Sequence, residues 1–140
     1  MRTTGQFCFA VLLTVALSFA VPLSHAAGTT PIILSEAQNG KSTTVSKDTT
    51  FTVQLSGNPT TGYSWSLFKL SGNSLKSNGK ITYTATPVKP GIVGSGGTFT
   101  APFKAVAAGK STITMQYARP WEHVPPVKIF TVTVVVTAAK

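Results

Sequence analysis

The stretch that decides the fold is FTVQLSGNPTTGYSWSL, residues 51–67. Apolar and polar residues alternate on both sides of its central turn. Because successive side chains of a β-strand point to opposite faces of the sheet, each half predicts a strand with one buried and one solvated face. The turn joins the two strands, and Trp65, which is in phase with Tyr63 and Leu67, is predicted to lie in the core.

The same period of two recurs along the chain, with the threonine and valine enrichment that strands prefer. Pro102 cannot donate to a sheet ladder, so its strand is the weakest and is expected only at a sheet edge or a bulge. Turn residues such as Asn-Gly and Pro-Gly separate the segments, and no window has helical periodicity. Further strands are therefore predicted at residues 32–34, 43–45, 81–84, 99–106, 113–117 and 130–134.

Strands with one apolar face must cover one another to keep that face from water. The sequence therefore predicts an all-β fold, an immunoglobulin-like antiparallel β-sandwich of about seven or eight strands. A closed barrel would bury the same faces and is the alternative.

The first residues have the pattern of a secretory signal peptide. Arg2 precedes an apolar run over residues 7–21, and Ala26 ends a short segment of the kind that signal peptidase accepts. The run is shorter than the roughly 20 residues of a membrane-spanning helix, which disfavours an anchor and stable membrane insertion. We therefore expect residues 1–26 to be cleaved and residues 27–140 to form a single secreted or periplasmic domain.

Composition limits the classes of partner. The single cysteine, Cys8, lies in the predicted leader, so packing alone must stabilise the domain. The formal net charge is +9, but the lysines are scattered singly along the chain. A nucleic-acid-binding protein more often clusters basic residues among stacking aromatics, so no nucleic acid partner is expected. The charge is interpreted as general solubility, with attraction to acidic partners or anionic envelope surfaces as the alternative.

Few residues of the predicted domain could carry out chemistry. It has one histidine, His123, and three carboxylates that lie far apart in the sequence, Glu36, Asp48 and Glu122. One histidine without a thiol does not fill a metal shell, and no nucleophile elbow is present for a Ser-His-Asp site. We therefore expect a binding protein and not an enzyme, with no catalytic residue, no metal and no cofactor.

Three loops are unusual for connectors. In the first, Pro59 fixes its own backbone φ, Gly62 permits a positive φ at the return, and the small, stiff side chains of Thr60 and Thr61 lie near the apex. Such a loop has little entropy to lose on binding. The alternative is an ordinary connection between two strands.

The other two loops offer different kinds of contact. Residues 94–97 are Gly-Ser-Gly-Gly, which leaves backbone groups open to a partner strand, although glycine-rich loops are also common as flexible connectors. Residues 119–121 are Arg-Pro-Trp. Trp121 could cap the end of the sandwich, or it could be an exposed aromatic beside an arginine, the residue types that dominate binding hot spots.

The three loops are expected at the same end of the domain. Numbered from the strand at residues 43–45, they follow the second, fourth and sixth predicted strands. If successive strands run up and down, the shared parity places them together, as antibody loops are placed. Three special loops at one end predict a composite binding edge.

The residues of these loops resemble the three signature loops of chagasin-type inhibitors of cysteine peptidases, in the same order and spacing. The resemblance covers about residues 42–137. It rests on Asn58, Pro59, Thr60, Thr61, Gly62 and Tyr63, then Gly94, Ser95, Gly96 and Gly97, then Arg119, Pro120 and Trp121.

The resemblance implies a monomeric immunoglobulin-like sandwich that reversibly blocks papain-like cysteine peptidases, whether the cell's own or foreign. It implies that the first loop enters the catalytic cleft, with Thr60 and Thr61 near the enzyme's cysteine. Residues 94–97 would pair through their backbone on one side of the cleft, and Arg119 and Trp121 would pack on the other. An envelope adhesion or assembly module is the alternative, and an enzyme would rest on His123 alone.

Overall fold

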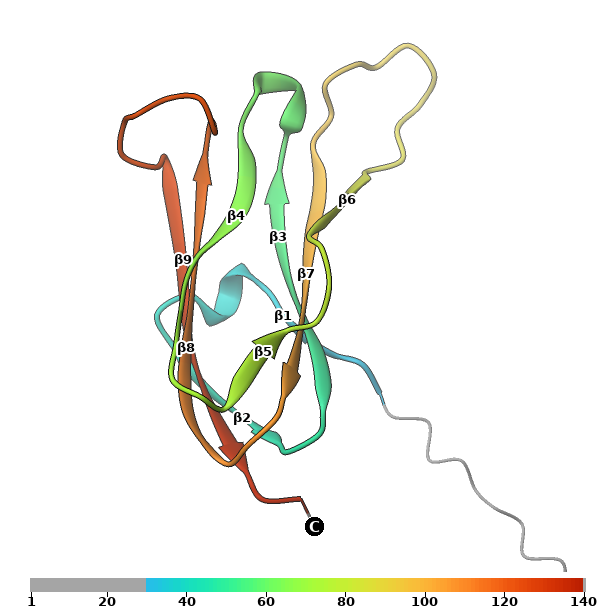
Figure 1. Cartoon of the computed structure of the whole chain (residues 1–140). Coiled ribbons are helices and arrows are strands. Elements are labelled where there is room, and N and C mark those ends of the chain that lie inside the picture. The colour runs from blue at the N-terminus through green and yellow to red at the C-terminus, as the bar shows by residue number, and fades with distance from the viewer. Residues whose placement is uncertain (1–29, 140) are drawn as a thin grey trace, which may run out of the picture.

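The computed structural model describes residues 30–139, which form two β-sheets packed face to face (Figure 1). The signal peptide predicted over residues 1–26 lies outside the described residues. Two single-turn 3-10 helices, η1 (Glu36–Gln38) and η2 (Pro59–Thr61), are found within the described range. No helix in that range has the length and apolar character needed to cross a membrane.

Nine strands make up the two sheets, and neither sheet closes on itself. The first, the β3–β7 sheet, contains β1 (Ile32–Leu34), β3 (Thr50–Gly57), β7 (Gly97–Ala105), β5 (Leu75–Ser77) and β6 (Thr82–Ala85). The second, the β8–β9 sheet, has the order β2 (Ser42–Ser46), β9 (Lys128–Thr137), β8 (Gly109–Ala118) and β4 (Ser64–Ser71).

The predicted β-sandwich is confirmed, with two corrections of detail. The β1–β3 and β2–β9 pairs are parallel, whereas the other pairs are antiparallel. The strand count is nine instead of seven or eight, because β5 was not predicted. Each early strand crosses to the other sheet, since β1 and β3 belong to one sheet and β2 to its partner.

β5 and β6 are two parts of one interrupted strand along the same side of β7. β5 pairs with residues 103–105 of β7, and β6 pairs with residues 97–100. Pro102 lies opposite the interruption, where its carbonyl accepts a hydrogen bond from the Asn78 amide at 2.9 Å. Of the two expectations for this strand, a sheet edge or a bulge, the edge is wrong, because β7 is central. The break between β5 and β6 removes the need for the amide hydrogen that Pro102 lacks.

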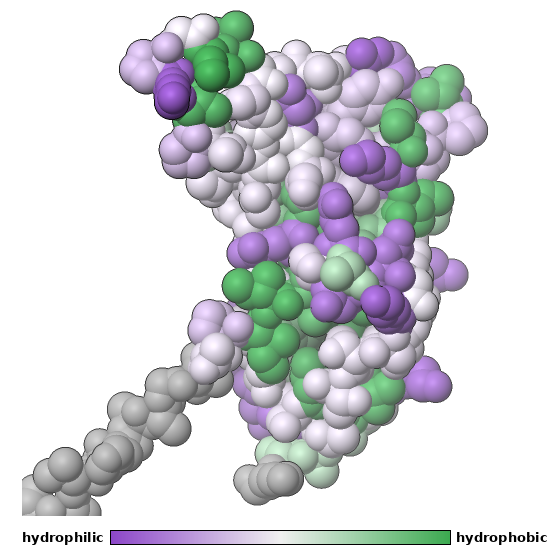
Figure 2. Space-filling model, turned by 180° about the vertical axis from the view of Figure 1, so that it is seen from behind, coloured by the Kyte–Doolittle hydropathy of each residue, from purple (hydrophilic) through white to green (hydrophobic). Residues whose placement is uncertain are grey.

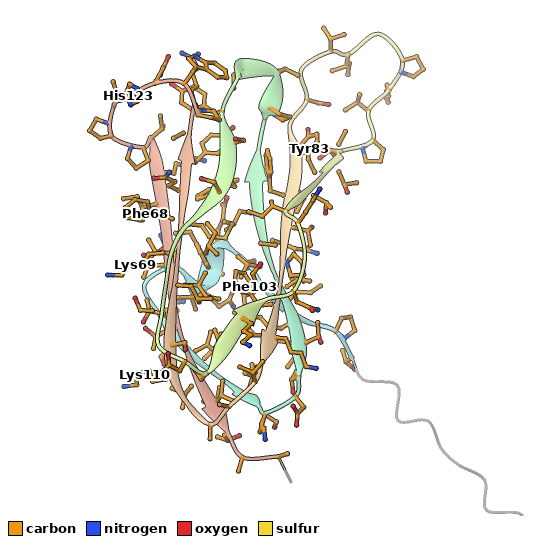
Figure 3. All side chains as sticks on the ribbon, viewed as in Figure 1. Phe68, Lys69, Tyr83, Phe103, Lys110 and His123 are labelled. Carbon is orange, nitrogen blue, oxygen red and sulfur yellow. The ribbon has the colours of Figure 1, made fainter. Side chains whose placement is uncertain are left out.

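The core lies between the sheets and consists of the alternating apolar residues. The rings of Phe51 and Phe103 stack across β3 and β7 with centroids 5.8 Å apart, and Figure 3 shows Phe103 pointing between the sheets. Trp65 is 5% exposed, as predicted. Its indole Nε1 donates to the Ser56 carbonyl of the opposite sheet at 2.9 Å, so a core residue also joins the two layers.

Exposed apolar residues gather in a few places. Seen from behind in Figure 2, one group lies at the upper left, at the tip of the segment between β6 and β7. Its members are Val88, Ile92 and Val93. Phe68 is a separate exposed ring that points away from the core (Figure 3), beside a β-bulge in β4.

One cross-strand pair on the outer surface is expected to lower stability. Lys76 of β5 lies directly opposite Lys104 of β7, and both are exposed. Like charges in this position repel one another. We therefore expect Lys104→Glu to raise the free energy of unfolding by about 0.5 kcal/mol, measured by urea titration at low salt.

The matched control is Lys110→Glu, which makes the same change of charge on β8 opposite Val135. It should give no comparable gain. Equal gains from both variants would attribute the effect to net charge and not to the Lys76–Lys104 pair.

Candidate functional site

Three connections lie at one end of the sandwich: the β3–β4 loop (residues 58–63), the β6–β7 loop (residues 86–96) and the β8–β9 loop (residues 119–127) (Figure 1). The predicted shared end is therefore confirmed. The unpredicted strand β5 does not change the alternation of strand directions on which this prediction rested, because β5 and β6 run in the same direction along β7.

The β3–β4 loop is closed by its own hydrogen bonds around Asn58. The Asn58 Oδ1 accepts from the Thr60 amide at 3.1 Å and from the Thr60 hydroxyl at 2.6 Å. The Thr61 hydroxyl donates to the Asn58 carbonyl at 2.7 Å. Gly62 ends the turn with a φ of 84°, and its amide donates to the Pro59 carbonyl at 2.9 Å. The loop is thus a compact capped turn in place of an extended connector.

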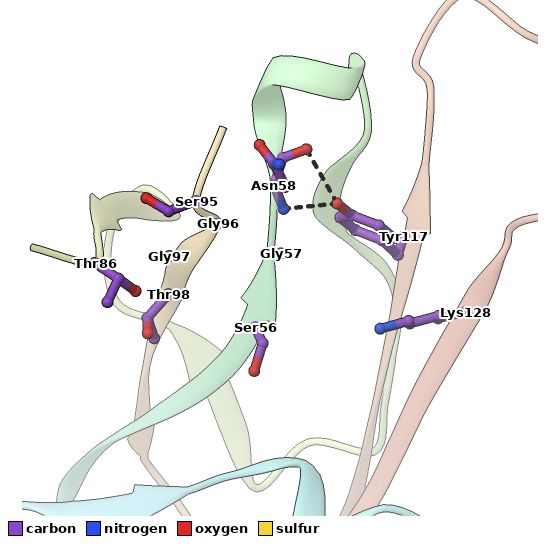
Figure 4. A pocket seen from close by; sticks show the side chains of 10 residues that line it. All are labelled: Ser56, Gly57, Asn58, Thr86, Ser95, Gly96, Gly97, Thr98, Tyr117 and Lys128. Atoms are coloured by element: carbon purple, nitrogen blue, oxygen red, sulfur yellow. Dashed lines mark hydrogen bonds between the residues drawn. The ribbon is translucent and has the colours of Figure 1, made fainter. Parts of the chain in front are cut away.

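Tyr117 supports this turn from the other sheet, as Figure 4 shows. Its hydroxyl accepts from the Asn58 amide at 2.8 Å and donates to the Asn58 carbonyl at 3.3 Å. The ring is 8% exposed and packs on Trp65, with centroids 5.2 Å apart. Sequence reasoning placed Tyr117 only in a strand. The sequence did contain a signal for this role. Tyr117 is at a core-facing position near the end of its strand, and the hydroxyl of a buried tyrosine usually needs a hydrogen-bond partner.

We expect Tyr117→Phe to lower the free energy of unfolding by about 1 kcal/mol, because the part-buried Asn58 amide loses its partner. Amide hydrogen exchange at Asn58 should become faster. Tyr83→Phe is the matched control, since that ring packs on Phe99 at 4.9 Å in the opposite sheet. Exchange at Asn58 that is unchanged in Tyr117→Phe would show that the hydroxyl does not hold the turn.

The β6–β7 loop is joined to the first loop by a side chain. The Asn58 Nδ2 donates to the Gly94 carbonyl at 2.7 Å. The base of the loop is closed by the Thr86 amide, which donates to the Gly96 carbonyl at 3.1 Å. The Asn58 side chain therefore orders two loops at once.

The four residues of the predicted glycine segment have different environments. A Cβ on Gly96 would meet the Gly57 carbonyl at 2.8 Å, and a Cβ on Gly97 would meet the Thr84 carbonyl and the Tyr83 hydroxyl. Gly97 is buried at the start of β7. Gly94 is exposed, whereas Ser95 and Gly96 are half-buried.

The β8–β9 loop lies against the first loop through Arg119 and Trp121. The Arg119 Nε donates to the Thr61 carbonyl at 3.1 Å, and the guanidinium lies 4.5 Å from the ring centre of Tyr63. Trp121 is 66% exposed, and a Cβ on Gly62 would meet its indole Cη2 at 2.7 Å. Trp121 therefore covers the first loop and does not cap the hydrophobic core.

Arg119 also forms the ion pair of this region. Its Nη1 lies 2.8 Å from the Glu122 Oε1. The hydrogen bond to Glu122 raises the pKa of Arg119 above its ordinary value, so the guanidinium remains charged throughout the physiological range.

An open cleft of about 560 Å³, lined largely by glycines and small polar residues, runs below the loops (Figure 4). Its only charged lining residue is Lys128. Within residues 30–139, no three His, Cys, Asp or Glu residues gather where they could hold a metal ion. His123 is exposed on the outer side of the β8–β9 loop (Figure 3). The part of the chain that the structure describes thus offers shape and hydrogen-bonding groups at this end, without paired acids or bases.

Comparison with known proteins gives a consistent result. The family model for the chagasin family peptidase inhibitor I42 matches residues 44–134. Amoebiasin-1 of Entamoeba histolytica is 35% identical over 88 residues, covering 63% of this chain and 82% of that protein. Chagasin of Trypanosoma cruzi is 30% identical over 92 residues, covering 63% of this chain and 81% of chagasin.

Solved structures are similar as well. The crystal structure of a cysteine protease inhibitor from Entamoeba histolytica has a TM-score of 0.67 and 29% identity, covering 76% of this chain and 95% of that one. The solution structure of amebosin has a TM-score of 0.62 and 34% identity, covering 77% and 99% respectively.

Proposed function

The chain belongs to the chagasin family of peptidase inhibitors, and we propose that its three loops together occlude the catalytic cleft of a papain-like cysteine peptidase. In this proposal the β3–β4 loop enters the cleft, with Thr60 and Thr61 foremost. The β6–β7 and β8–β9 loops contact the two sides. Inhibition is reversible and requires no chemistry from the inhibitor.

The observation that carries the proposal is the connection of the three loops into one edge. Asn58 bonds the β6–β7 loop through Gly94, and Arg119 bonds the β8–β9 loop to Thr61. An edge that is ordered before binding loses little conformational entropy on binding, which favours affinity.

The compact turn also explains how the loop could occupy a peptidase cleft without being cut. Hydrolysis requires a carbonyl that the enzyme can polarise in its oxyanion hole. Here the Asn58 carbonyl accepts from the Thr61 hydroxyl, the Pro59 carbonyl from the Gly62 amide, and the Thr61 carbonyl from Arg119. These three carbonyls are already engaged within the inhibitor, which disfavours cleavage of the peptide bonds that follow Asn58, Pro59 and Thr61.

Export of the mature domain is part of the proposal. The leader pattern at residues 1–26 supports secretion or delivery to a periplasm, where a peptidase of the same cell or of another organism could be met. Mass measurement of the N-terminus of the exported protein tests it, and an uncleaved leader would contradict it.

The test of function is a titration of papain with residues 27–140. Active-site-titrated papain is mixed with increasing inhibitor, and hydrolysis of a small fluorogenic peptide is followed. We expect loss of activity that depends on dose, with the inhibitor recovered uncleaved. Full activity of papain and of several cathepsin-like peptidases with a folded sample would contradict the proposal and favour the envelope-module alternative.

A further inference from the structure

The turn that contains Trp121 is closed by a backbone hydrogen bond and by an ion pair between the same two residues. The Glu122 amide donates to the Arg119 carbonyl at 3.1 Å, which makes residues 119–122 a hydrogen-bonded turn with Pro120 in the position that proline favours. The side chains of the same two residues are joined by the ion pair at 2.8 Å. Trp121 therefore lies between two residues that are bonded through both backbone and side chain.

Arg119 makes three contacts with groups of its own chain. One donor bonds the Thr61 carbonyl, another bonds Glu122, and the face of the guanidinium lies over Tyr63. A guanidinium with planar, directional donors that is held on three sides loses little freedom in this pose. These contacts are with residues of the inhibitor's own loops, so Arg119 holds the loops in position.

We propose that Glu122 is a positioning residue, which holds Arg119 against the β3–β4 loop and so fixes the pose in which Trp121 meets a peptidase. The inference rests on the proposed function and deepens it, since Glu122 lies outside the three signature motifs. Arg119 serves the same purpose, because its hydrogen bond to Thr61 fixes the turn of residues 119–122 relative to the β3–β4 loop. The indole is seated on Gly62 because the turn is anchored one residue away, at Thr61.

Inhibition of papain by Glu122 variants gives the first test. We expect Glu122→Ala to weaken inhibition about tenfold, in the range found for residues coupled in one hydrogen-bond network. Glu122→Gln should lose less, because its amide oxygen still accepts from Arg119. Asp48→Asn is the control: it removes the same charge in the turn before β3, at the opposite end of that strand, where its φ of 66° suits asparagine.

A double-mutant cycle separates positioning from direct contact. In a Trp121→Ala background, Glu122→Ala should have almost no further effect on inhibition. A tenfold loss that persists in that background would mean that Glu122 touches the peptidase itself, and the proposal would be wrong.

A measurement on the free inhibitor keeps the test independent of the target. A Cβ built on Gly62 would lie 2.7 Å from the indole Cη2, so the α-hydrogen in that position faces the ring and its NMR resonance reports the ring's position. In Glu122→Ala it should move toward the position it takes in Trp121→Ala. An unmoved resonance together with full inhibition would overturn the proposal. If the parent protein inhibits no peptidase, the proposed function is at fault, and the Gly62 resonance alone decides whether Glu122 positions the turn.

Discussion

Trp121→Ala is expected to weaken inhibition of papain by roughly 30-fold or more, which corresponds to about 2 kcal/mol or more. The side chain is 66% exposed in the free protein, so its removal costs no core packing and the melting temperature should stay unchanged. An exposed tryptophan held in a fixed pose offers a large apolar area that a partner can bury with little loss of entropy. Inhibition constants and a thermal melt of the same preparations measure both effects.

The chain contains a matched control for this variant. Phe68 is also 66% exposed, but it lies on the outer face of the β8–β9 sheet beside the bulge in β4, where its nearest loop residue is Pro126 at the base of the β8–β9 loop. Phe68→Ala should therefore leave inhibition unchanged. If both variants weakened inhibition equally, the contact surface would extend down the sheet, and if neither did, the loop edge would not be the site.

The sandwich itself could be predicted because its signal is local and repeated. Every long strand has apolar residues at alternate positions, and the inward phase read from residues such as Phe51 and Ile113 is the buried phase in the structure. The common end of the loops followed from strand parity alone. These properties depend only on the side-chain period of a strand and on the direction of the chain.

The missed features all depend on a partner distant in sequence. β5 has three residues, too few for a period to be recognised, and it exists because β7 offers a free side there. Pro102 was assigned to an edge or a bulge, because the break in the strand opposite it cannot be predicted from its own segment. Tyr117 supports Asn58 from 59 residues away. Gly97 proved to be a packing residue for the same reason, since the atoms that exclude a Cβ belong to β6.

The motif residues could be identified from the sequence, but which of them hold the loops and which contact a partner could not. Thirteen positions were assigned to peptidase binding, and that assignment stays a prediction. The structure adds that several of them bond to one another: Asn58 to Gly94, and Arg119 to Thr61. A residue type and its spacing indicate that a loop is special, whereas only the contacts show which side chains hold the loop and which remain available to a partner.

Gly62→Ala is expected to reduce inhibition about as much as Trp121→Ala, roughly 30-fold. Two effects combine at this position. A φ of 84° is strained for alanine and should cost about 1–2 kcal/mol of folding free energy. The new methyl group would also lie 2.7 Å from the indole Cη2. Because the indole is exposed and the backbone below it is fixed by the turn, the ring is the group that must move, and Trp121 leaves its presenting pose.

Gly40→Ala separates these two effects. Gly40 has a φ of 73°, but nothing lies within 4 Å of a Cβ built there. It should therefore show a similar loss of folding free energy by urea titration, with inhibition unchanged. The difference between the two variants isolates the displacement of Trp121 from the backbone strain. Full inhibition by a folded Gly62→Ala protein would mean that the packing of the indole on Gly62 is not needed for binding. The loops would then act separately and not as one preformed edge.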